Sequence, residues 1–213
     1  MKEFAKDKPN ARLYIHTEPT PMFGGIDFPA MLDRLDLKEK VIFPDRYQYS
    51  TGYPEKFLRL VYNSADIFLG ASMSEGFGIP LIEAQACGTP IITTDWTSMP
   101  ELVREGVAVE PADLFWTPMN SWQAIPDTKG ITQALHEYYG KWEAFGNDWT
   151  LTQRHELEKT IHDEFTWATI MRDQWAPLIT ELAGDVVPLS DPTQNGTGYG
   201  LQRRPEEAEK VTL

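Results

Sequence analysis

The stretch that decides the fold runs from Ser64 to Leu102 and reads SADIFLGASMSEGFGIPLIEAQACGTPIITTDWTSMPEL. It opens with the apolar run 67–69, which has the length of a buried strand and is bounded by glycine and small polar residues. A loop over 74–80 follows, with two glycines and a proline in the order Ser-Glu-Gly-Phe-Gly-Ile-Pro. This order predicts that a strand leads directly into a loop and then into a helix.

The helix after this loop has recognisable ends. Pro80 suits the first helical turn, where its missing N–H group costs nothing, and Gly88 is a typical residue for the stop. The apolar run 90–94 then predicts the next strand. The loop therefore joins the carboxyl end of a strand to the N-terminus of a helix. Free backbone N–H groups and the helix dipole favour anions at such a place.

Two carboxylates flank this predicted anion site. Glu75 lies in the loop, and Glu83 lies about one turn inside the helix. A carboxylate at the second position can accept two hydrogen bonds from a vicinal diol such as a ribose. The order acid, amides, acid matches the hexose, pyrophosphate and ribose of a nucleotide sugar. Taken one at a time, however, such acids are as consistent with helix capping or a solvated surface, and Gly76 and Gly78 with an ordinary turn.

The complete string resembles a known family. EGFGIPLIEA over 75–84, followed by ACGTPIITTD over 86–95, resembles the E-x7-E signature of retaining sugar-nucleotide glycosyltransferases of family 4, also called glycosyl transferases group 1. The flanking pieces YNSAD at 62–66 and MPEL at 99–102 agree with it. The resemblance extends over residues 11–109 and resumes at the tryptophan-containing helix near the C-terminus.

The resemblance implies a role for each site residue. Glu75 is expected to be the catalytic residue, facing the donor sugar and stabilising positive charge at the anomeric carbon. The loop amides are expected to hold sugar hydroxyls and the distal phosphate, and the second acid the ribose diol. The donor-binding residues are then Gly76, Phe77, Gly78, Ile79 and Glu83. The loop at Pro44 and Asp45 is expected to lie near the base.

The implied reaction is transfer of a hexose from a nucleoside diphosphate sugar with retention of anomeric configuration. It needs no metal and no other cofactor, because amides and cations stabilise the departing diphosphate. A glycan, a lipid-linked glycan and a protein all remain open as acceptors. The alternative is a non-catalytic nucleotide-sugar-binding or regulatory module, or one subunit of a split glycosyltransferase.

Members of this family have the GT-B architecture, with two Rossmann-like domains and the active site between them. This chain resembles the C-terminal, donor-binding domain, without its first strand and without the Arg…Lys pair that follows that strand. Lys2, Lys6 and Lys8 belong to the helix that comes after. We therefore expect an N-terminal domain or partner chain to complete the enzyme, and the isolated chain need not be active. The predicted strands 12–16 and 67–70 would lack their shared neighbour.

Strands alternate with helices along the chain, which predicts an α/β fold: a Rossmann-like parallel sheet with helices on both faces. The predicted domain covers 1–184 and the polar remainder, 185–213, is expected to be a disordered tail. Residues 111–128 read as an aromatic loop. Trp116, Trp122, Trp142 and Trp149 could stack on sugars, but packing in the core or in loops is the expected role. The predicted strands are 12–16, 41–43, 67–70, 90–94 and 107–109, and the later helices are 129–140, 150–162 and 166–182.

Composition narrows the function classes. The 213 residues carry a net charge of −13, which opposes binding to nucleic-acid phosphates. No apolar run approaches the roughly 20 residues of a membrane span, and the charged N-terminus does not read as a signal peptide, so we expect a cytoplasmic protein. The single cysteine, Cys87, predicts a small buried side chain rather than a nucleophile. The four histidines show no metal-binding spacing.

Overall fold

The computed structural model describes residues 1–20 and 24–184, without the side chains of 147–150. The predicted tail over 185–213 lies outside the described residues. The chain divides into two units, one spanning Met1–Ile161 and one beginning at His162. The predicted site lies wholly within the first unit.

All five predicted strands are present and all pair in parallel. In the first sheet, β1 (Leu13–Tyr14) pairs with β2 (Val41–Ile42). The second sheet has the order β3-β4-β5 and consists of Phe68–Gly70, Ile91–Thr94 and Gly106–Val109. The central strand β4 is the most deeply buried, with all four residues enclosed.

The single sheet expected from the sequence is divided, because β1 and β3 belong to separate sheets. These are the two strands that were predicted to lack a shared neighbour. Within the described ranges 1–20 and 24–184, each has only one paired edge. Unpaired strand edges need partners from water or from other strands. The missing strand itself stays a prediction.

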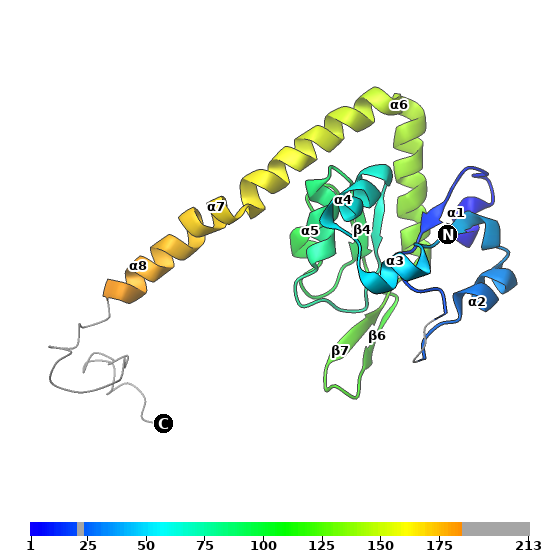
Figure 1. Ribbon diagram of the computed structural model, residues 1–213, viewed down its shortest axis with the longest axis horizontal. Coiled ribbons are helices and arrows are strands. Elements are labelled where there is room, and N and C mark those ends of the chain that lie inside the picture. The colour runs from blue at the N-terminus through cyan, green and yellow to red at the C-terminus, as the bar shows by residue number, and fades with distance from the viewer. Residues whose placement is uncertain (21–23, 185–213) are drawn as a thin grey trace. The chain divides into compact units, whose positions relative to one another are not determined.

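Helices cover both faces of the β3-β4-β5 sheet, as predicted (Figure 1). On one face, Ile92 of β4 packs with Ile131 and Ala134 from the first turns of α6 (Thr128–Phe165). On the other face lies α5 (Ile79–Ala86), which contacts β3, β4 and α4. The other helices of this unit are α1 (Lys2–Ala5), α2 (Phe28–Leu35), η1 (Lys38–Lys40), α3 (Arg46–Thr51), α4 (Glu55–Ser64) and η2 (Pro100–Leu102).

Local capping explains a helix that the sequence reading missed. The Asp45 carboxylate accepts a hydrogen bond from the Gln48 N–H group at 3.0 Å and so caps α3. Asp27 caps α2 in the same way through the Ala30 N–H group. An aspartate at this position satisfies one of the free donors of the first turn.

The prediction of an aromatic loop over 111–128 is wrong. This segment contains an antiparallel hairpin of β6 (Asp113–Trp116) and β7 (Trp122–Ile125). Aromatic side chains favour strands, and the five-residue connection 117–121 suits a hairpin. Prolines at 111, 118 and 126 made the sequence look irregular. The hairpin extends beyond the ends of the parallel strands (Figure 1).

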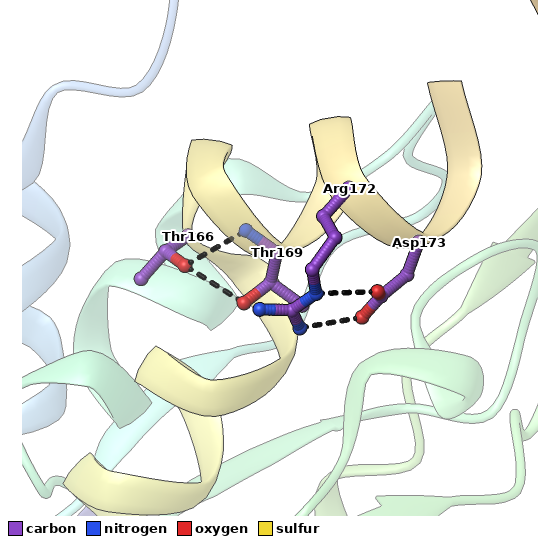
Figure 2. A network of polar contacts seen from close by, with 4 residues as sticks. All are labelled: Thr166, Thr169, Arg172 and Asp173. Carbon is purple, nitrogen blue, oxygen red and sulfur yellow. Dashed lines mark hydrogen bonds and ion pairs between the residues drawn. The ribbon is translucent and has the colours of Figure 1, made fainter. Parts of the chain in front are cut away.

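Two predicted helices merge into the long helix α6, whose backbone leaves helical geometry at Gly146. The last predicted helix is also present, as α7 (Trp167–Ile170), a π-helical turn (Met171–Trp175) and α8 (Ala176–Gly184). Figure 2 shows the start of this segment: the Thr166 hydroxyl accepts from the Thr169 N–H group at 3.3 Å, and Arg172 pairs with Asp173. No described helix combines the length and apolarity that crossing a membrane requires.

Candidate functional site

The predicted anion site lies where the β3–α5 loop enters α5. Gly78 occupies the N-cap with φ of +99°, a conformation that favours glycine, and no side chain caps the helix. In the described part of the chain, the N–H groups of residues 76–79 have no protein acceptor. A row of free donors at a helix N-terminus favours a bound anion.

Two hydroxyl side chains from the loop after β4 hold this loop in place. Ser98 Oγ donates to the Phe77 carbonyl at 2.9 Å and lies 3.2 Å from the Glu75 carbonyl. The Glu75 N–H group donates to Thr97 Oγ1 at 3.2 Å. Sequence reasoning missed both residues. The signal was available, because the carboxyl ends of neighbouring parallel strands meet at one sheet edge.

Glu75 is a half-buried carboxylate with a fixed position. Its Oε1 accepts a hydrogen bond from Ser72 Oγ at 2.8 Å. Its backbone is bound at both the N–H group and the carbonyl by Thr97 and Ser98. A charged side chain oriented in this way is suited to electrostatic work, because little reorganisation is needed.

Glu83 lies on the exposed surface of α5 and is held from α4. The Tyr62 hydroxyl donates to Glu83 Oε2 at 2.9 Å. Tyr62 is itself anchored, because its carbonyl accepts from Thr89 Oγ1 at 2.7 Å and its ring meets Phe68 edge-on. Burial and the hydrogen bond to Glu83 raise the pKa of Tyr62 well above its usual value. The Tyr62 phenol therefore stays protonated and donates a hydrogen bond to Glu83 at neutral pH.

The predicted site residues belong to one continuous loop and helix, but the two acids are held by different neighbours. Glu75 is bound from the β4 end, and Glu83 is bound from α4. The apolar side chains of Phe77 and Ile79 are exposed beside the free amides. Asp45 caps α3 at the end of the other sheet, and the contact of this region with a base stays a prediction.

The β6–β7 hairpin is a further neighbour of the site. The Ala124 N–H group donates to the Met73 carbonyl at 2.8 Å, two residues before Glu75. Trp116 and Trp122 pack edge-on against each other across the hairpin, with ring centroids 5.3 Å apart, but they are not part of the core and are 54% and 53% exposed. Trp142 is also exposed, although its ring contacts Tyr139.

The remaining candidates offer little chemistry. Cys87 is half-buried, and burial raises the pKa of its thiol, which disfavours a nucleophilic thiolate. Across residues 1–20 and 24–184, no group of histidine, cysteine and carboxylate side chains could hold a metal ion. An open hollow on α4 is lined by Lys56, Arg59, Leu60 and Asn63 and includes none of the predicted site residues.

The fold and the site define an α/β domain whose strand–loop–helix element presents free amides between two carboxylates. The chain belongs to the family of glycosyl transferases group 1, whose model matches residues 30–147. This match confirms the resemblance seen in the string over 75–95.

Named relatives cover part of the chain. O-antigen chain mannosyltransferase B of Escherichia coli is 36% identical over 93 residues, 39% of this chain and 24% of its own length. D-inositol 3-phosphate glycosyltransferase of Mycolicibacterium vanbaalenii is 35% identical over 88 residues, 41% of this chain and 19% of its own length. The chain therefore spans about a quarter or less of the length of these curated relatives.

Solved structures confirm the predicted fold class. The pneumococcal O-GlcNAc transferase GtfA, in complex with UDP and GlcNAc, superposes with a TM-score of 0.58 at 19% identity, over 86% of this chain and 32% of that chain. Sucrose-phosphate synthase from Thermosynechococcus elongatus gives 0.54 at 20% identity, over 81% and 38%. At such identities the likeness concerns the fold alone.

Proposed function

We propose that this chain supplies the donor-binding half of a glycosyltransferase that moves a hexose from a nucleoside diphosphate sugar to an acceptor with retention. One observation supports this most: in a member of this family, free amides at residues 76–79 lie between Glu75 and Glu83 on one loop and helix. Amides and a helix N-terminus suit a diphosphate. The two acids suit hydroxyl groups at its ends.

Glu75 is proposed to face the hexose and to stabilise the positive charge that develops at the anomeric carbon. Ser72 donates to Oε1, and within residues 1–20 and 24–184 no protein group donates to the other oxygen, Oε2. The amides of Phe77, Gly78 and Ile79 would hold sugar hydroxyls and the distal phosphate. The hydrogen bonds to the departing diphosphate would strengthen as its negative charge grows.

Glu83 is proposed to bind the ribose diol. Tyr62 donates to the Oε2 atom of this exposed residue, and the Oε1 atom is proposed to receive the ligand. Hydrogen bonds from hydroxyl groups to an ionised carboxylate are stronger than those between neutral groups. That no metal takes part in the reaction stays a prediction.

The second candidate function is nucleotide-sugar binding without transfer, either in a regulatory module or in one subunit of a split enzyme. The chain spans only 24% and 19% of the length of the two curated relatives, so groups outside this chain would have to complete the site. A transfer assay with radiolabelled donor sugars separates an enzyme from a binding module.

Calorimetric titration of the full chain with UDP, GDP and ADP sugars tests the donor site. Glu83→Ala is expected to weaken binding by about 1–3 kcal/mol, because charge-assisted hydrogen bonds are lost. Glu39→Ala is the matched control, since it removes an equal charge from an exposed position on η1. Equal affinities of wild type and Glu83→Ala would refute the ribose role.

A further inference from the structure

The β6–β7 hairpin carries two exposed indole rings on one face of its tip. We propose that Trp116 and Trp122 form a platform that binds a neutral saccharide, as part of the acceptor site. The acceptor role rests on the proposed function, whereas the saccharide platform can be tested by itself.

The two indoles form one continuous surface. Trp116 and Trp122 are directly opposite each other in the antiparallel register, so their side chains share a face of the hairpin. Their ring centroids lie 5.3 Å apart at an interplanar angle of 73°. About half of each side chain is exposed. An angled aromatic pair offers both a ring face and a ring edge to a ligand.

The hairpin is attached to the chain just before the β3–α5 loop through β7. The next cross-strand pair on the same face is Leu114 and Ala124, because side chains alternate between faces along a strand. Ala124 is fully enclosed, and its N–H group binds the Met73 carbonyl at 2.8 Å. The outer edge of β7 is therefore bonded to the loop before Glu75, and the face that carries the enclosed Ala124 side chain continues into the tryptophan pair.

The hairpin tip is held firmly. Buried Thr117 donates through its N–H group to the Ser121 carbonyl at 3.0 Å, and its hydroxyl lies 3.2 Å from Ser121 Oγ. The Asn120 N–H group closes the turn on the Thr117 carbonyl at 3.0 Å. A rigid connection keeps both rings in place before a ligand arrives, which lowers the entropic cost of binding.

The chemistry of the tip favours a neutral polyhydroxylated ligand. Asp113 is the one charged residue in 113–125, while Asn120, Ser121 and Gln123 supply neutral hydrogen-bonding groups. The C–H groups of a sugar ring can pack on the electron-rich face of an indole. Platforms that stack nucleobases are paired with basic grooves, and this hairpin has no cation.

The test uses the full chain labelled with ¹⁵N and follows the indole N–H resonances during titration with mannotriose, maltotriose and chitotriose. At least one sugar is expected to shift the resonances of Trp116 and Trp122. Trp116→Ala and Trp122→Ala should each weaken that binding by about tenfold or more. Trp167→Ala is the matched control, because it removes an indole that is 76% exposed on α7.

A parallel titration with UDP, GDP and ADP sugars separates this proposal from the donor site. If nucleotide sugars bind and no trisaccharide does, the platform is refuted and the donor function stands. If a trisaccharide moves both indoles but no nucleotide sugar binds, the platform stands and the donor function fails. The platform is also refuted if nucleotide alone moves the two indoles, or if sugar affinity survives both substitutions in variants that retain the wild-type circular dichroism spectrum.

Discussion

Gln85 is expected to be the polar side chain on which the stability of the site most depends. It lies on α5 and is fully enclosed. Its amide nitrogen donates to the Leu81 and Leu102 carbonyls at 3.0 and 2.9 Å. Its Oε1 atom accepts from the N–H groups of Arg104 and Glu105 at 2.8 and 3.2 Å. One side chain therefore ties α5 to the segment between η2 and β5.

The expected cost follows from the groups that lose this partner. In Gln85→Ala, the Leu102 carbonyl and two N–H groups outside α5 each lose a hydrogen bond. An unsatisfied buried group costs about 1–3 kcal/mol. Because water can reach part of the segment 103–105, we expect the free energy of unfolding to fall by about 3–5 kcal/mol.

Urea titration followed by far-ultraviolet circular dichroism measures this loss. Gln85→Leu keeps most of the side-chain volume while removing the hydrogen bonds, so it should lose nearly as much stability as Gln85→Ala. Gln133→Ala is the control, because Gln133 is an exposed glutamine on α6 that binds Glu137, and its loss should be within about 0.5 kcal/mol. Amide hydrogen exchange in β4 confirms that the first unit is the part affected. A loss below about 1 kcal/mol in Gln85→Ala would refute the reasoning.

Two further expectations concern pH and backbone geometry. Burial is the larger cause and a hydrogen bond to a carboxylate the second cause that raise the pKa of Tyr62 and of Tyr138. The folded protein therefore keeps two phenol protons that the unfolded chain releases at about pH 10. Their contribution to stability should be complete below that pH and decline above it, and phenylalanine at both positions should flatten the decline in urea titrations across this range. Gly106→Ala should lower the melting temperature in calorimetry, because φ is +147° and a Cβ would lie 1.9 Å from a β4 backbone oxygen. At Gly140 in α6 an added Cβ would have no atom within 4 Å, so Gly140→Ala should raise the melting temperature. A lower melting temperature in both variants would contradict the steric explanation.

Local sequence was sufficient to predict the strand–loop–helix–strand element over residues 67–94. The strand, loop, helix and strand over 67–94 each depend on residues close in the chain, such as Pro80 at the helix start and Gly88 at its end. The hairpin was missed because its two strands are short and prolines occur at 111, 118 and 126, beside both strands and in the turn. Only the cross-strand pairing, from Asp113 with Ile125 to Trp116 with Trp122, shows that the segment is ordered as a sheet.

The sequence by itself determined the family, the parallel α/β fold and the position of the loop between Glu75 and Glu83, because these depend on neighbouring residues and on a recognisable string. Only the tertiary structure decided which groups hold the two acids: Thr97 and Ser98 for the loop, and Tyr62 for the helix. It also decided that the hairpin binds the chain just before the β3–α5 loop and that the parallel strands form two sheets. Such contacts join residues distant in the chain, and no local pattern specifies which side chains will meet when the strands and helices pack.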